Sequence, residues 1–176
     1  MVLLAGLVLT VPAVHASPQG ARLFSDIQTV ILPNGLKVIL RENHAAPVVT
    51  LQAWVRVGSA QESDGQAGMA HVLEHMLFKG TEKRTAFQIA QAIDRVGGFL
   101  NAFTEKEITC LYCTLPREHL ELAVDVVTDM VNNSVLSTEE IEKEKLVVIN
   151  EIKSIEDNPE ERAYEFYLET MWKDHV

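Results

Sequence analysis

The residues with the clearest chemical potential lie in one short segment, His71-Val72-Leu73-Glu74-His75. On a helix with about 100° between successive residues, the side chains of His71, Glu74 and His75 share one sector of about 100°. Two imidazoles four residues apart can hold one metal ion, and a carboxylate beside them can take a proton from a water molecule at that ion. The segment therefore predicts a hydrolytic zinc site with Glu74 as its general base.

The same segment has a second interpretation, as a helix with two histidines satisfied in the core and a glutamate at the surface. The other positions of the expected helix are apolar: Met69, Ala70, Val72, Leu73, Met76 and Leu77. This composition predicts that the helix is buried on its remaining sides. Three ionisable groups on a buried helix need partners, and a zinc ion would satisfy both histidines.

A hydrolytic zinc site needs three protein ligands and one open position, so a third ligand must come from elsewhere in the chain. Apart from the acidic residues, the remaining candidates are His15, His44, His119 and His175. Glu144 and Glu151 lie seven residues apart on an expected long helix, which places them about 10.5 Å apart along its axis. Both flank its apolar stripe, where a carboxylate could reach a site beneath the helix. Alternatively, both are ordinary solvated glutamates.

The strands that must support this helix are predicted from segments in which apolar and polar residues alternate and from segments rich in β-branched residues. We expect strands near residues 29–32, 36–40, 48–57, 100–104 and 108–115. The first two are joined through Pro33-Asn34-Gly35, and the Asn-Gly pair supplies the positive φ values of a tight hairpin turn.

Helices are expected at residues 67–78, from Thr85 to before Gly97, after Pro116, from Ser137 to about Ile155, and from Asn158-Pro159 onward. The long fourth helix has an apolar stripe that should be buried: Ile141, Val148, Ile152 and Ile155. The order of the elements predicts an α+β fold, in which helices cover one face of a largely antiparallel sheet.

Composition and charge narrow the class of protein. The 176 residues are 47% hydrophobic and 23% charged, which fits one globular domain and neither a disordered chain nor a polytopic membrane protein. The formal net charge is −10, and residues 137–176 hold 12 acidic against five basic residues. An acidic surface repels phosphate backbones, so we expect no nucleic-acid partner.

The N-terminus resembles a secretory leader. Residues 2–14 form an uncharged apolar run too short to span a bilayer, and Val14-His15-Ala16 precedes Ser17 like a cleavage site. We therefore expect a signal peptide at residues 1–16, a domain at residues 17–176 without a membrane span, and export to the bacterial periplasm or the medium. The alternative, a buried N-terminal helix, fits poorly with Pro12.

Cys110 and Cys113 are the only cysteines. Three residues apart on a strand, they point to opposite faces and cannot easily form a disulfide with each other. The alternative, half of a zinc site, lacks a second pair of cysteines, so we expect two buried thiols.

Several further segments occur in the order found in one enzyme family. These are Leu32-Pro33-Asn34-Gly35-Leu36-Lys37-Val38, Trp54-Val55-Arg56-Val57-Gly58-Ser59, Gly68-Met69-Ala70 before the histidine segment, Met76-Leu77-Phe78-Lys79-Gly80-Thr81, Gly97-Gly98-Phe99-Leu100-Asn101-Ala102-Phe103-Thr104 and Asn150-Glu151-Ile152. With the 76-residue separation of His75 and Glu151, this pattern resembles the pitrilysin/insulinase family of inverted-motif zinc peptidases, which includes mitochondrial processing peptidase.

The resemblance implies a function and a role for each site residue. It implies a zinc-dependent endopeptidase acting on extended or unfolded peptides, with one zinc ion per chain. His71, His75 and Glu151 would be the ligands, Glu74 the general base and Glu144 an auxiliary acid. The strand at residues 100–104 would offer a free edge to the peptide substrate, with Asn101 and Ala102 lining the scissile bond.

The chain also departs from the family pattern. Many relatives have a tyrosine at the position of Leu111, whereas here the tyrosine is Tyr112. Relatives are at least twice as long and contain two homologous halves. We therefore expect residues 17–176 to be the N-terminal peptidase domain, truncated before the end of the first half, with a second homologous half-domain or a partner subunit. Two alternatives follow: a non-catalytic substrate-binding subunit or inactive fragment, and a zinc-stabilised structural domain.

Overall fold

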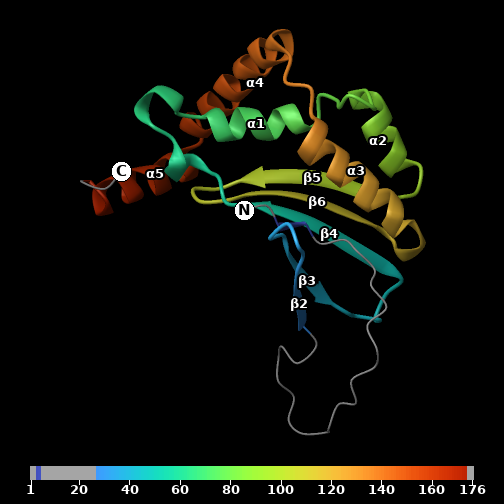
Figure 1. The fold of residues 1–176 in the computed structure, drawn as a ribbon. Coiled ribbons are helices and arrows are strands. Elements are labelled where there is room, and N and C mark those ends of the chain that lie inside the picture. The colour runs from blue at the N-terminus through green and yellow to red at the C-terminus, as the bar shows by residue number, and fades with distance from the viewer. Residues whose placement is uncertain (1–2, 5–26, 174–176) are drawn as a thin grey trace, which may run out of the picture.

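A computed structural model describes residues 3–4 and 27–173 of the chain (Figure 1). The predicted leader lies outside the described residues except for β1 (Leu3–Leu4). Two of the histidines considered as third ligands, His15 and His175, also lie outside them.

The strands form two antiparallel sheets. β2 (Ile27–Ile31) and β3 (Lys37–Arg41) make a separate hairpin. The main sheet contains β4 (Val48–Val55), β5 (Phe99–Thr104), β6 (Thr109–Pro116) and β1, in the order β1-β4-β6-β5. β5 is therefore an edge strand, and β6 is the only described strand with which it pairs.

The helices are α1 (Met69–Leu77), α2 (Ala86–Asp94), α3 (Leu120–Asn133), α4 (Thr138–Glu156) and α5 (Pro159–Met171). The side chains of Thr85, Ser137 and Asn158 accept hydrogen bonds from backbone N–H groups in the first turns of α2, α4 and α5, which confirms the predicted starts of these helices. No helix in the described part of the chain is both long and apolar enough to cross a bilayer.

The elements form layers around one core. Helices α1, α2 and α3 lie over the same face of the main sheet, and α4 packs on the outside of α1 (Figure 1). The core lies between the sheet and α2 and α3. Its buried side chains are Leu51, Ala53, Ile89, Ile93, Ala102, Leu111, Cys113, Leu115, Ala123, Val126, Val127 and Met130. The predicted α+β fold is confirmed.

The turn between β2 and β3 differs from the prediction. Only Gly35 has a positive φ, of 83°, whereas Asn34 does not. The N–H of Gly35 donates to the carbonyl of Leu32 over 2.8 Å, and the Asn34 side chain accepts from the N–H of Leu36 over 3.1 Å. Because the loop contains five residues rather than two, one left-handed residue is sufficient to close it.

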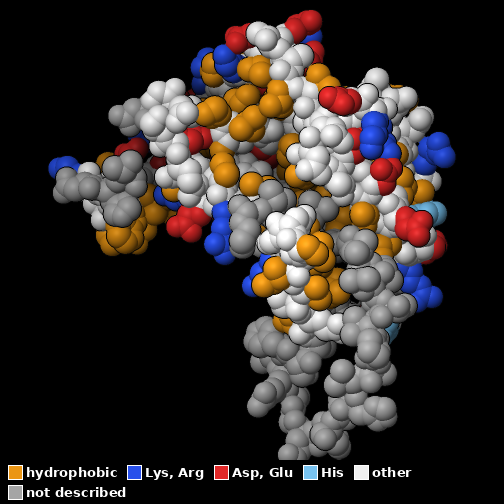
Figure 2. Space-filling model, in the orientation of Figure 1, with side chains coloured by type: hydrophobic (Ala, Val, Ile, Leu, Met, Phe, Trp, Pro, Cys, Tyr) orange, Lys and Arg blue, Asp and Glu red, His pale blue; other side chains and the backbone are white. Residues whose placement is uncertain are grey.

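Two predictions of burial were wrong in part. Of the α4 stripe, Val148 is buried, but Ile152 and Ile155 are 47% and 40% exposed. Ile152 lines an open groove between α1 and α4 with Val72 and Met76, so the described residues cover this stripe only in part. On α1, Met69 and Leu73 are also exposed. Figure 2 shows the resulting apolar surface over α1 and α4.

The two cysteines are free and fully buried, as predicted. Cys113 belongs to the core between sheet and helices, whereas Cys110 pairs in register with Trp54 and Phe103, whose rings meet edge to face with centroids 5.8 Å apart. Burial raises the pKa of each thiol to about 11. Both thiols therefore remain protonated at neutral pH, which suits a packing role.

A buried carboxylate joins the loop after α1 to α3. Asp129 is 1% exposed and accepts hydrogen bonds from Thr81 Oγ1 over 2.7 Å, from Arg84 over 2.6 Å and from Asn133 over 2.9 Å. Burial alone would raise the pKa of Asp129, but these donors more than offset burial and lower the pKa below its usual value. The ionised form of Asp129 therefore stabilises the fold.

Asp129→Asn is expected to lower the free energy of unfolding at pH 7 by about 2–3 kcal/mol, because it weakens charge-assisted hydrogen bonds to a buried group. A carboxyl group whose pKa is lower in the folded state stabilises the protein above the unfolded pKa, and this contribution is lost as the pH falls through the folded pKa. Urea denaturation between pH 7 and pH 3 should therefore show stability declining below about pH 5. The variant should decline less steeply than the parent chain; equal slopes would contradict this assignment.

Candidate metal centre

Glu62 fixes the start of α1. The helix is preceded by Gly68, whose φ of 83° is unfavourable for other residues and whose lack of a side chain leaves the first N–H groups uncapped. Both oxygens of the Glu62 carboxylate accept hydrogen bonds here, from the N–H of Gly68 over 2.7 Å and of Ala70 over 2.6 Å. Sequence reasoning missed Glu62, because an acceptor six to eight residues before its donors follows no fixed spacing.

The loop that carries Glu62 is held against the turn between β5 and β6. Backbone N–H groups of Ser59 and Ala60 donate to the carbonyls of Glu105 and Lys106 over 3.3 and 2.7 Å. A Cβ atom at Gly58 would lie 2.1 Å from the Glu105 carbonyl oxygen, so this close approach requires glycine. The position of α1 is thereby tied to the end of β5.

The structure brings His71, His75 and Glu151 together. His71 Nε2 lies 3.2 Å from His75 Nε2, and Glu151 Oε2 lies 3.3 Å from His71 Nε2 and 3.5 Å from His75 Nε2. Within the described residues, this is the one group of three or more histidine, cysteine or acidic side chains that could hold a metal ion. His44, His119 and both cysteines lie outside it.

These distances fit a tetrahedral zinc site. Zinc binds imidazole nitrogen and carboxylate oxygen at about 2.0–2.2 Å, so two ligand atoms of a regular tetrahedron lie roughly 3.3–3.6 Å apart. The three separations in the structure lie within or just below this range. Two imidazole nitrogens and a carboxylate oxygen also present lone pairs to one another, and a cation between them removes the repulsion. The donor set therefore fits zinc without rearrangement.

Glu144 lies behind His75, outside the donor group. It is 6% exposed; its Oε2 lies 3.0 Å from His75 Nδ1 and its Oε1 lies 2.6 Å from Lys79 Nζ. Burial would raise the pKa of Glu144, but the hydrogen bonds from Lys79 and His75 outweigh burial and lower it. An ionised Glu144 accepts the Nδ1 proton of His75, which leaves the Nε2 lone pair facing His71 and Glu151.

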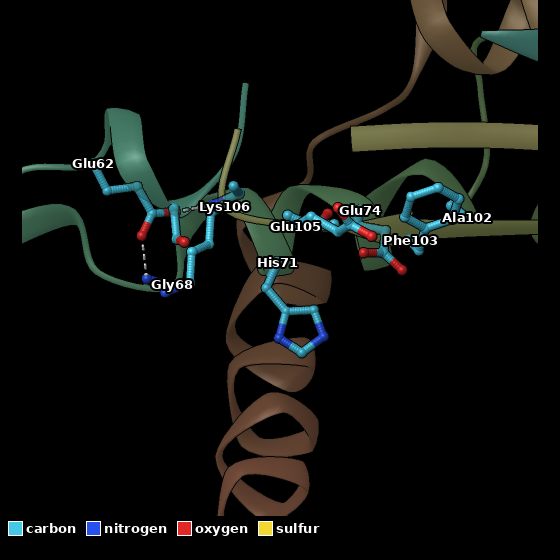
Figure 3. A pocket seen from close by; sticks show the side chains of 11 residues that line it. Glu62, Gly68, His71, Glu74, Ala102, Phe103, Glu105 and Lys106 are labelled. Carbon is cyan, nitrogen blue, oxygen red and sulfur yellow. Dashed lines mark hydrogen bonds between the residues drawn. The ribbon is translucent and has the colours of Figure 1, made fainter. Parts of the chain in front are cut away.

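Glu74 faces an open cavity of about 450 Å³ beside β5 (Figure 3). The cavity is lined by Ser59, Glu62, Gly68, Ala70, His71, Glu74, Ala102, Phe103, Thr104, Glu105 and Lys106. Among the described residues, no hydrogen bond or ion pair engages the half-buried Glu74 carboxylate. It is therefore available to exchange a proton with a molecule in the cavity.

The two residues predicted to line the scissile bond lie differently. Ala102 is buried and lines the cavity, whereas the exposed Asn101 does not line it. The Asn101 side chain instead accepts a hydrogen bond from the N–H of Ala102 over 2.9 Å. Phe103 and Lys106, which sequence reasoning did not select, also line the cavity because β5 and its turn run past α1.

The chain is similar to zinc proteases over most of its length. Residues 37–176 match the sequence profile of the family described as Insulinase (Peptidase family M16). The chain is 46% identical over 144 residues to an uncharacterized zinc protease of Mycobacterium leprae, covering 82% of this chain and 32% of that protein. It is 39% identical over 142 residues to the uncharacterized zinc protease YmxG of Bacillus subtilis, covering 81% and 35%.

The fold is also similar to a solved structure. The crystal structure of a protease from Helicobacter pylori aligns with a TM-score of 0.68 and 29% identity, covering 71% of this chain and 30% of that chain. The chain thus spans about a third of the length of these relatives.

Proposed function

Because the chain belongs to the insulinase family, peptidase family M16, we propose that it is the N-terminal part of a zinc-dependent endopeptidase that hydrolyses extended or unfolded peptides. The observation that carries this proposal is the triangle formed by His71 Nε2, His75 Nε2 and Glu151 Oε2, with sides of 3.2–3.5 Å. Its size suits one tetrahedral zinc ion per chain, with a fourth position open.

The three donors would hold the ion, and Glu144 would support them by fixing the tautomer of His75. A bound zinc ion would supply a Lewis acid for the scissile carbonyl and would lower the pKa of a water molecule. Glu144 would therefore act through His75, as a positioning residue, rather than on the substrate.

Glu74 would carry the proton. Its carboxylate lines the cavity beside His71 and has no partner among the described residues. It would accept a proton from the attacking water as a general base, hold it on a carboxylate oxygen, and deliver it to the nitrogen of the leaving amine. Glu74 would then carry out both proton transfers of the hydrolysis.

The β5 edge would hold the substrate. β5 is an edge strand, and Ala102 and Phe103 place it along the same cavity as His71 and Glu74. An extended peptide can add to such an edge through backbone hydrogen bonds, which requires an unfolded segment rather than a particular sequence. A substrate strand at Ala102 would compete with the hydrogen bond from its N–H to Asn101.

A second candidate function is substrate binding without cleavage. The chain spans only about a third of its relatives, so contacts supplied by the rest of those proteins would be absent from it. A homologous second half-domain or a partner subunit would supply them. Residues 1–16 would direct the protein for export, to the periplasm or outside the cell.

The test combines metal content with turnover. Zinc per chain is measured after dialysis, and an internally quenched, unstructured peptide is incubated with the protein, with and without a chelator. The proposal predicts about one zinc per chain and cleavage that the chelator stops and added zinc restores. Zinc binding with peptide binding but no cleavage would favour the second function, and absence of zinc binding would contradict the proposed peptidase.

A further inference from the structure

Lys79 belongs to a chain of contacts that ends at the metal centre. Its ammonium group lies 2.6 Å from Oε1 of Glu144, and the other oxygen of this carboxylate lies 3.0 Å from Nδ1 of His75. The side chain of Glu144 is 8% exposed and that of Lys79 is 29% exposed. A buried carboxylate held on both oxygens has one orientation, and here each oxygen has its own partner.

The backbone of Lys79 is itself held in place. Its N–H donates to the carbonyl of Met76, in the last turn of α1, over 3.1 Å. Two residues later, the hydroxyl group of Thr81 donates a hydrogen bond to the buried carboxylate of Asp129 on α3. Lys79 therefore reaches Glu144 from a segment fixed on both sides, which makes it a suitable anchor for a carboxylate on another helix.

Anchoring Glu144 also sets the position of Glu151. The two residues lie seven apart on α4, two turns along the helix, with the buried Val148 between them. A rigid helix that is fixed at Glu144 against the end of α1 can present Glu151 only to a limited region further along α1. That region contains His71 and His75, whose Nε2 atoms lie 3.3 and 3.5 Å from Glu151 Oε2.

We propose that Lys79 is a positioning residue of the metal centre, which holds Glu144 against His75 and sets the register of α4 that places Glu151. This inference rests on the proposed metal site and adds a residue to its support. Lys79 contacts neither the donor atoms nor the cavity beside Glu74, so its effect on metal binding is indirect.

An exposed ion pair on α4 provides the comparison. Lys145 pairs with Glu142 over 2.6 Å, the same separation as that between Lys79 and Glu144, but the side chains of Lys145 and Glu142 are 52% and 62% exposed. An exposed ion pair of this kind contributes little to holding its two side chains in place, because solvent competes for both charges. Lys145→Met is thus the matched control for Lys79→Met, which keeps the length of the apolar stem and removes only the charge.

The experiment measures zinc affinity by competition with a chromogenic chelator, for the parent chain, Lys79→Met, Lys79→Arg and Lys145→Met. Loss of a side chain that orients a metal ligand without touching the metal commonly costs 10–100-fold in metal affinity. Lys79→Met should therefore bind zinc about tenfold more weakly. Lys79→Arg, which keeps a cationic donor, and Lys145→Met should stay within about twofold. A Lys79→Met affinity equal to the parent's would overturn the proposal.

A double-mutant cycle separates this role from general destabilisation. If Lys79 acts through Glu144, Lys79→Met should weaken zinc binding in the parent but cause no further loss in a Glu144→Gln chain. An undiminished loss in that background would overturn the proposal. If Lys79→Met does not fold, Lys79→Gln takes its place, because it also removes the charge; an affinity equal to the parent's would overturn the proposal. A parent chain that binds no zinc would instead refute the metal centre itself.

Discussion

Glu74→Gln is expected to reduce peptide hydrolysis by at least about 100-fold while leaving one zinc ion bound per chain. A positioned general base contributes roughly 10²–10⁴ to a hydrolytic rate, and glutamine has the size of glutamate but cannot accept and return a proton. Metal binding should not change, because Glu74 lies outside the group formed by His71, His75 and Glu151. Turnover of the quenched peptide and zinc content after dialysis measure the two effects separately.

The matched control for this experiment is Glu107→Gln. Glu107 lies on the turn between β5 and β6, near the cavity but not in its lining, and it carries the same charge. Its substitution should leave both turnover and zinc content near the parent values. Hydrolysis by Glu74→Gln at the parent rate would remove Glu74 from the mechanism, and loss of zinc would instead make it a ligand.

Glu151→Gln is expected to release zinc during dialysis against a weak chelator that leaves the parent chain loaded. The substitution replaces an anionic ligand with a neutral amide. The affinity for zinc should therefore fall by more than the roughly 10–100-fold that is typical when a residue behind a ligand is changed. Hydrolysis should fall with zinc occupancy and recover in part when excess zinc is added.

The control on the same helix is Glu156→Gln at the exposed end of α4, which should retain zinc like the parent. Unfolding of the zinc-free proteins should occur at similar denaturant concentrations, because the Glu151 side chain is half exposed and its substitution opens no cavity in the core. Unchanged zinc content in Glu151→Gln would exclude this residue as a ligand.

Residue types and spacing were sufficient to predict α1 and the side of it that carries His71, Glu74 and His75. They were also sufficient to place Glu144 and Glu151 at the edge of the α4 stripe, because helical periodicity fixes angles about an axis. Capping residues such as Thr85 and Ser137 gave the starts of helices correctly, since their side chains act on local backbone groups.

Properties that depend on how elements pack could not be predicted. The periodicity of α4 marks Val148 and Ile155 as equally apolar, yet Val148 is buried and Ile155 is 40% exposed, because burial depends on which other elements lie against each turn of the helix. Helical periodicity likewise does not distinguish Glu144 from Glu151, which share the same edge of the stripe. They differ in their partners: Glu144 is buried against Lys79, which lies 65 positions before it in the chain and meets it only in the folded protein.

Crystals of the zinc-loaded protein, measured on both sides of the zinc absorption edge, would locate the ion directly. We expect one anomalous peak about 2.0–2.2 Å from Nε2 of His71, Nε2 of His75 and a carboxylate oxygen of Glu151, with His75 Nδ1 still hydrogen-bonded to Glu144. A zinc ion held elsewhere, or by the two histidines with the Glu151 side chain turned away, would contradict it.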